Sequence, residues 1–137
     1  MNRSASRSLL QIGALATLAT GSSAWAATVQ LKLEVPRLNV AEYHRPYIAV
    51  WVEKAGESGP AVAQLAVWYD TKKQNNAGTK WLKDMRQWWR KAGRTMSFPV
   101  DGISGATRAP GPQKLVFGGA KGPLKDLKPG QYNLVVE

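Results

Sequence analysis

The segment 101–111 is where this sequence gathers groups that could take part in chemistry. It reads DGISGATRAPG and offers a carboxylate at Asp101, hydroxyls at Ser104 and Thr107, and a guanidinium at Arg108. Glycines leave the backbone uncovered, and a loop with so little side-chain bulk is accessible to a second protein. Composition alone equally describes a tight polar loop between strands, in which Asp101 forms an Asx turn with the glycine that follows it.

No other pattern in the sequence indicates catalysis or metal binding. The chain has no cysteine, which excludes disulfides, thiolate chemistry, iron–sulfur ligation and c-type haem attachment. A single histidine, His44, is poor evidence for a metal site without a second ligand nearby, and His44–Tyr47 is better explained as a bend before a strand. Ser-His-Asp arrangements, paired catalytic carboxylates, P-loops and glycine fingerprints for nucleotides are also absent from the sequence.

The first 26 residues have the three parts of a secretory signal. Arg3 and Arg7 precede an apolar run at 9–18, and Ala24-Trp25-Ala26 supplies small residues where signal peptidase requires them. We therefore predict cleavage after Ala26 and a periplasmic location. The apolar run is shorter than the roughly 20 residues that span a bilayer.

The charge balance limits the kind of partner. A formal charge of +10 attracts anions, and about +8 of it stays with residues 27–137. An exported protein does not meet nucleic acid, so no nucleic-acid partner is expected. Anionic membrane surfaces, through peripheral contact, and phosphate-bearing cofactors remain, while exposed lysines also serve solubility alone.

Residues 27–137 have the patterning of a single mainly β domain. Alternating apolar residues predict a first strand, and two more apolar strands should form a hairpin. Six to seven short strands separated by turn signals indicate an Ig-like β-sandwich. In that fold Tyr132, after Pro129-Gly130, should tie its hydroxyl back to the preceding corner. The expected strands are 28–35, 47–53, 62–69, 96–100, 114–117 and 131–136.

One stretch between the strands changes period. Apolar residues at helical spacing predict one inserted amphipathic helix over about 80–92, with Thr79 as its cap and Gly93 as its stop. The tryptophans after the leader are expected mainly in packing. Because Trp88 and Trp89 are adjacent, one of the two is expected to be more exposed.

The four residues Ser104-Gly105-Ala106-Thr107, with Asp101 ahead of them, resemble a known motif for covalent flavin attachment. The motif occurs in subunits of the sodium-pumping NADH:quinone reductase and the Rnf complex, and in FMN-bind domains. There an ApbE-type flavin transferase takes FMN from FAD and joins its phosphate to the hydroxyl of the final Thr or Ser.

This resemblance implies a role for each residue of the motif. Thr107 would be the acceptor of FMN, while Ser104, Gly105 and Ala106 would hold phosphate oxygens in a small anion nest. Asp101 would help the transferase position metal or activate the hydroxyl. Arg108, next to the attachment point, would meet the phosphate.

A wider resemblance covers most of the chain after the leader. The segments EYHRPYIAVWVE, LAVWYD, KWLKDMRQWWRKAG and VDGISGATRAPG, in that order, resemble a family of small predicted periplasmic proteins of unknown function, the DUF2271 type. Its genes lie near those of ApbE-type transferases and PepSY-type membrane proteins, which implies a membrane-bound redox partner. Members often extend beyond the point where this chain stops, which implies that a last strand is missing.

Two functions from different classes follow. The first is a periplasmic electron carrier with FMN on Thr107, which is closer to an electron-transfer protein than to an enzyme with its own substrate. The second is a cofactor-free binding or accessory module that docks a membrane reductase or another anionic partner. A third interpretation is a binder of polyanions or membrane surfaces. Dependence on Thr107 separates the first from the other two.

Overall fold

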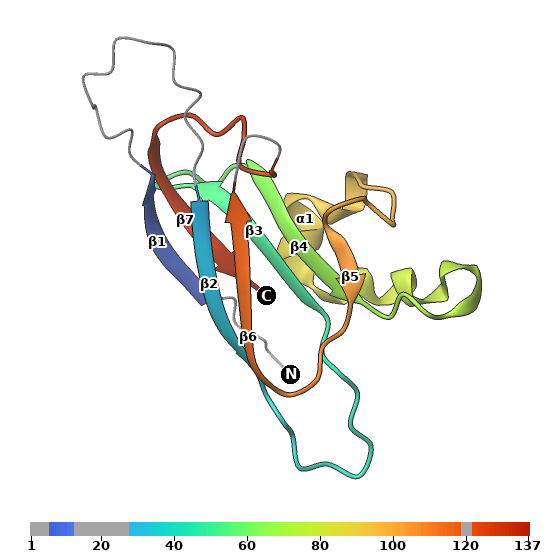
Figure 1. Ribbon diagram of the computed structural model, residues 1–137. Helices are drawn as coiled ribbons and strands as arrows, with labels where there is room; N and C mark the ends of the chain where they lie inside the picture. The colour runs from blue at the N-terminus through green and yellow to red at the C-terminus, as the bar shows by residue number, and fades with distance from the viewer. Residues whose placement is uncertain (1–5, 13–27, 119–121) are drawn as a thin grey trace.

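The computed structural model describes residues 6–12, 28–118 and 122–137 as two β-sheets with a helical segment beside them (Figure 1). Strands β2 (Thr28–Val35) and β6 (Gly111–Gly118) form an antiparallel pair. The second sheet has five strands in the order β1-β7-β3-β4-β5. This confirms the predicted mainly β fold with two sheets. The strands of the larger sheet are β1 (Ser6–Ile12), β3 (Ile48–Lys54), β4 (Ala63–Tyr69), β5 (Ser104–Ala106) and β7 (Gly130–Val136).

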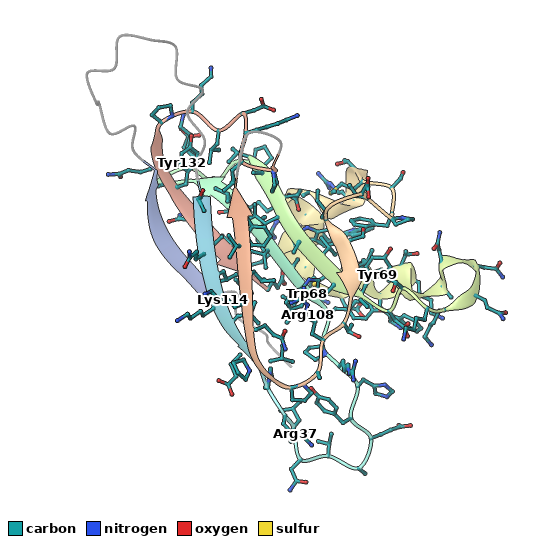
Figure 2. All side chains as sticks on the ribbon, in the orientation of Figure 1. Arg37, Trp68, Tyr69, Arg108, Lys114 and Tyr132 are labelled. Carbon is teal, nitrogen blue, oxygen red and sulfur yellow. The ribbon has the colours of Figure 1, made fainter. Side chains whose placement is uncertain are left out.

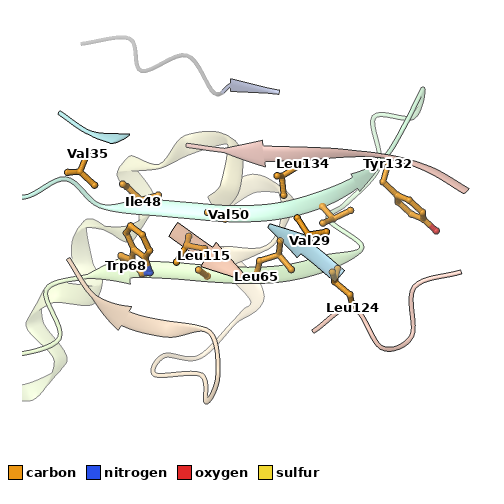
Figure 3. Packing of buried hydrophobic residues seen from close by; sticks show 12 residues of the cluster. Val29, Val35, Ile48, Val50, Leu65, Trp68, Leu115, Leu124, Tyr132 and Leu134 are labelled. Carbon is orange, nitrogen blue, oxygen red and sulfur yellow. The ribbon is translucent and has the colours of Figure 1, made fainter. Parts of the chain in front are cut away.

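The central strands β3 and β4 are buried on both faces. On one face, Val50 and Leu65 pack with residues of the two-stranded sheet in a cluster shown in Figure 3. On the other face, Trp51 and Val67 pack against the helical segment in a second cluster. Because successive side chains of a strand point to opposite faces, these apolar strands require a layer on each side. The molecule therefore has three layers.

The helical layer differs from the single helix predicted over about 80–92. It consists of a 3₁₀ segment η1 (Gln74–Asp84), a short helix α1 (Arg86–Lys91) and a 3₁₀ turn η2 (Gly93–Thr95). Met85 separates the first two with ψ of 80°, and Asn75 and Asn76 interrupt η1 with positive φ. Met85 is only 5 % exposed, so its side chain is packed against the sheet at the point where the helix is interrupted. The predicted capping role of Thr79 is also wrong, because its hydroxyl donates to the carbonyl of Asn76.

Trp88 anchors the helical layer to the sheet. Its side chain is 0 % exposed, and its indole nitrogen donates to Oε1 of Gln64 on β4 at 2.9 Å. Gly93 is predicted as the residue at which the helix stops, and the structure shows a further reason for glycine at this position. A Cβ atom at this position would lie 2.5 Å from the Trp88 ring, so only glycine fits.

The predicted strand at 96–100 is not formed. Phe98 instead places its ring 5.6 Å from that of Trp88 and 5.9 Å from that of Tyr69. Pro99 has no amide hydrogen for a ladder, and the next strand, β5, begins only at Ser104. The apolar residues of this segment therefore pack on the helical layer and do not belong to a paired strand.

A tyrosine corner lies at the start of the last strand, β7. The hydroxyl of Tyr132 donates to the carbonyl of Lys128, which confirms the predicted tyrosine corner. The predicted cleavage point after Ala26 lies outside the described residues. Within the described ranges, none of the helices has the length and apolar character needed to cross a membrane.

Removal of residues 1–26 would take β1 away from β7 and leave that edge without its partner strand. Ala49 and Glu137 exchange both backbone hydrogen bonds. In an antiparallel ladder, hydrogen-bonded and non-hydrogen-bonded residue pairs alternate along the strands. The amides of Asn133 and Val135 therefore point to β3, and those of Tyr132 and Leu134 point to β1.

In a protein that comprises residues 27–137, we expect the Tyr132 and Leu134 amides to exchange with solvent much faster than those of Asn133 and Val135. Residue-resolved hydrogen exchange by NMR measures the difference. Equal protection of all four amides would show that another segment, or a second copy of the chain, covers the edge of β7.

Candidate functional site

The flavin-attachment-like motif begins with a turn and continues as the edge strand of the larger sheet. Asp101 is exposed in the turn, followed by Gly102 with φ of +77°, a conformation that favours glycine. The Ser104 hydroxyl accepts a hydrogen bond from the Val100 amide at 2.8 Å and closes the turn. Residues 104–106 then pair in parallel with β4. The motif is therefore anchored at both ends, and part of it is a strand where composition alone describes a tight polar loop.

The conformation of residues 104–106 differs from that of an anion nest. Ser104, Gly105 and Ala106 are extended in β5, whereas a nest needs successive residues in alternating helical conformations. The amide of Thr107 is already used, because it donates to the carbonyl of Tyr69 at 3.3 Å. What the strand does provide is a fixed backbone position for Thr107 at its exit.

Trp68 is the surface on which the motif lies. Gly105 lies against this ring, because a Cβ atom at Gly105 would lie 3.4 Å from Cδ1 of Trp68, at van der Waals distance. On the same ring, the guanidinium of Arg108 lies 4.2 Å from the centroid, and Figure 2 shows the two side chains next to each other. Arg108 also donates to Oε1 of Gln113 at 3.4 Å. These contacts hold the backbone on both sides of Thr107.

A cavity of about 1170 Å³ opens beside Thr107. It lies at the end of the larger sheet where β4, β5 and β7 finish and β3 begins. The loop before β3 and the junction between η1 and α1 form its other walls. Of the six residues that the motif nominated, Thr107 alone lines this cavity. The lining residues are Tyr43, His44, Arg45, Pro46, Tyr47, Asp70, Lys73, Trp81, Asp84, Met85, Arg86, Gln87, Thr107 and Glu137.

The lining combines aromatic surfaces with charges of both signs. Trp81 is 36 % exposed, and the ammonium groups of Lys73 and Lys80 lie 4.9 and 4.3 Å from its ring centroid. Cation–π contacts of this kind occur over electron-rich ring faces. With Tyr43 and Tyr47 also in the wall, the cavity suits a flat, partly apolar ligand. Three basic residues of the lining, Arg45, Lys73 and Arg86, are matched by three acidic ones, Asp70, Asp84 and Glu137.

Tyr47 fixes one wall of the cavity to the helical layer. Its hydroxyl donates to the carbonyl of Gly78 at 2.9 Å. Burial raises the pKa of the Tyr47 phenol above its ordinary value of 10.0 and outweighs a hydrogen bond with the Asp70 backbone, which lowers this pKa. Tyr47 is therefore a neutral hydrogen-bond donor at physiological pH.

Glu137 makes a second connection between the sheet and the helical layer at the cavity. Its carboxylate accepts hydrogen bonds from the backbone amides of Gln87 at 3.2 Å and Trp88 at 2.7 Å. These amides lie at the start of α1, where helices leave amide donors without partners. The last residue after β7 thereby ties the helical layer to the sheet at the rim of the cavity.

Several residues of the cavity were not nominated from the sequence. Arg45 belongs to the segment interpreted as a bend, Tyr43 was given no role, and Trp81 was expected mainly in packing. Arg108, expected at the phosphate, is engaged on Trp68 instead. In the described part of the chain, no group of three or more metal-ligating side chains is close enough to hold an ion. The chemistry on offer is thus the hydroxyl of Thr107 beside a cavity lined by aromatic rings and by charges of both signs.

Comparisons with known proteins give one match. A family model described as "Predicted periplasmic protein (DUF2271)" matches residues 28–137, which confirms the wider resemblance seen in the sequence. No curated protein and no solved structure matches the chain. The matched range contains both sheets apart from β1, together with the whole cavity.

Replacement of Tyr47 by Phe should destabilise the fold by about 1 kcal/mol at neutral pH, because the hydrogen bond to Gly78 is lost. In the folded protein the raised pKa keeps the phenol protonated at pH values where the unfolded chain ionises it. The contribution of Tyr47 is therefore complete below pH 10.0 and lost as the pH rises through the raised pKa. Urea unfolding of both proteins should show a difference that shrinks above that pH, and a difference that grows would contradict this account.

Proposed function

Because this chain belongs to the DUF2271 family of predicted periplasmic proteins, we propose that it is a periplasmic flavoprotein that carries electrons on an FMN attached covalently to Thr107. The observation that carries the proposal is the coincidence of two independent features. The sequence motif nominates the Thr107 hydroxyl, and the same residue lines the cavity of about 1170 Å³.

The attachment is a phosphoryl transfer in which Thr107 is the acceptor. The hydroxyl oxygen of Thr107 bonds to the FMN phosphorus of FAD, the bond between the two phosphates breaks, AMP leaves, and the hydroxyl proton is released. An ApbE-type transferase supplies the catalytic groups. This chain supplies a hydroxyl on a fixed backbone, because β5 pairs with β4 before Thr107 and Arg108 rests on Trp68 after it.

The cavity residues suit the flavin once it is attached. Trp81, Tyr43 and Tyr47 offer ring faces and edges on which a planar tricyclic ring can stack. Arg45, Lys73 and Arg86 can offset the charge of the phosphate and of the ring after it accepts electrons. The flavin supplies the redox chemistry, while the protein orients it and limits its contact with solvent. A membrane-bound redox partner, of the PepSY type implied by the resemblance, would exchange electrons with it.

Attachment is tested by intact mass and peptide mapping after periplasmic co-expression with an ApbE-type transferase. Wild type should gain one FMN on the peptide that contains Thr107. Thr107→Val keeps the side-chain shape but lacks the hydroxyl, so it should gain none. Thr107→Ser keeps a hydroxyl and should be labelled.

Ser104→Ala is the matched control for this experiment, because it removes the other hydroxyl of the motif without touching the acceptor. It should retain FMN on Thr107. An unmodified wild type, while a known flavin-accepting domain is labelled in parallel, would remove the flavin proposal. The cofactor-free docking module would then be the working account.

Occupation of the cavity by the ring is tested separately. Stacking of a flavin on tryptophan quenches flavin fluorescence, so Trp81→Leu should leave attachment intact and raise the fluorescence per attached flavin. Trp89→Leu is the control, because Trp89 does not line the cavity. Equal fluorescence in wild type and both variants would indicate that the ring lies outside the cavity.

A further inference from the structure

We infer that the connection between β2 and β3, residues 36–47, is a docking loop for an anionic lipid membrane. The aliphatic tip of this loop lies outside the cavity that contains Thr107, although residues 43–47 of the loop line that cavity. Membrane docking by the tip does not require an attached flavin.

The docking loop exposes two large aliphatic side chains close together. Leu38 is 43 % exposed and Val40 is 53 % exposed. The other exposed large hydrophobic residues in the described part of the chain, Val62, Trp81 and Val116, lie on separate elements. Single exposed hydrophobic residues are normal on protein surfaces, whereas two on one short segment are a feature that needs a reason.

The loop is held in a defined shape that presents these side chains. The hydroxyl of Tyr43 donates to the carbonyl of Pro36 at 2.7 Å and closes the base of the loop. The Val40 amide donates to the Leu38 carbonyl at 3.1 Å near its tip. Figure 1 shows the connection extending well beyond the ends of β2 and β3. Leu38 and Val40 belong to this extended connection, and neither is part of the two hydrophobic clusters of the core.

The charges around the tip suit anionic headgroups. Arg37 and Arg45 flank the aliphatic pair, and Glu42 is the one acidic residue between β2 and β3. The whole chain has a net charge of +10, so an anionic surface attracts it over a longer range. Aliphatic side chains beside arginines are the pattern by which peripheral proteins insert into the boundary between headgroups and acyl chains.

The shape of the loop favours lipid over a protein partner. A stable protein–protein interface buries about 800 Å² on each side, usually over a broad surface. A projecting tip with two aliphatic side chains offers little flat area, but it can enter a bilayer. Tyr43–Pro46 at the end of the loop also line the cavity that contains Thr107, so a docked molecule would turn that cavity toward the membrane.

Insertion can be followed with a label at one position, because the chain has no cysteine. Leu38→Cys carries the environment-sensitive fluorophore NBD, with Val62→Cys and Val116→Cys as exposed controls. The protein comprises residues 27–137 and carries no flavin. On vesicles that contain phosphatidylglycerol, the label at position 38 should shift to the blue and brighten, while the two control labels should not. A label at position 38 that stays in water while the protein sediments with the vesicles would overturn the proposal.

Unlabelled variants measure the energetic contribution of the tip by vesicle co-sedimentation. Leu38→Ser with Val40→Ser should lower partitioning onto phosphatidylglycerol vesicles by at least about fivefold, while Val62→Ser with Val116→Ser should change it little. Binding should weaken with salt and be much lower on phosphatidylcholine alone. Wild-type binding by the loop variant, or an equal loss in the control pair, would overturn the proposal. Matching melting temperatures confirm that both variants are folded.

Discussion

Burial of β3 and β4 on both faces is the constraint on which the rest of the structure depends. A strand that is apolar on both faces must be covered on both sides. The pair β2–β6 covers one face through the cluster around Val50 and Leu65, and the helical segment covers the other around Trp51 and Trp88. The helical segment is interrupted at Met85, between η1 and α1, and the residues on either side of this interruption form one wall of the cavity. The cavity thus arises from the way in which the sheet is covered.

Buried polar contacts fix the helical layer in one position. Glu53 is 2 % exposed, accepts a hydrogen bond from the Trp51 indole at 2.9 Å, and pairs with Lys91 at 3.7 Å. Lys91 in turn donates to the carbonyl of Gly59. Breaking a buried pair of this kind typically costs about 3–5 kcal/mol, because a charge is left without compensation. With Glu137 at the start of α1, these contacts keep the wall of the cavity in register with the strand ends.

The small residues of the motif meet a structural demand of this fold as well as the proposed chemical one. Gly102 provides a positive φ in the turn, where a residue with a side chain would be strained. A Cβ atom at Gly105 would meet the Trp68 ring at ordinary van der Waals distance. The composition that resembles an attachment site is therefore also compatible with the turn and the edge strand.

The sequence by itself determined the elements that depend on local pattern. Alternation of apolar residues predicted the strand at 28–35, and the Pro-Gly turn before Tyr132 predicted the tyrosine corner. Each of these signals is local, because the residues that form it lie within a few positions of one another in the sequence. Tertiary structure decided what depends on distant segments. Burial on the sheet divided the expected helix, ring packing replaced the strand expected at 96–100, and pairing with β4 made a strand of 104–106. Tertiary structure also brought Tyr43, Trp81 and Thr107 to one cavity, because the order and direction of the strands decide which strand ends lie side by side at one end of the sheet.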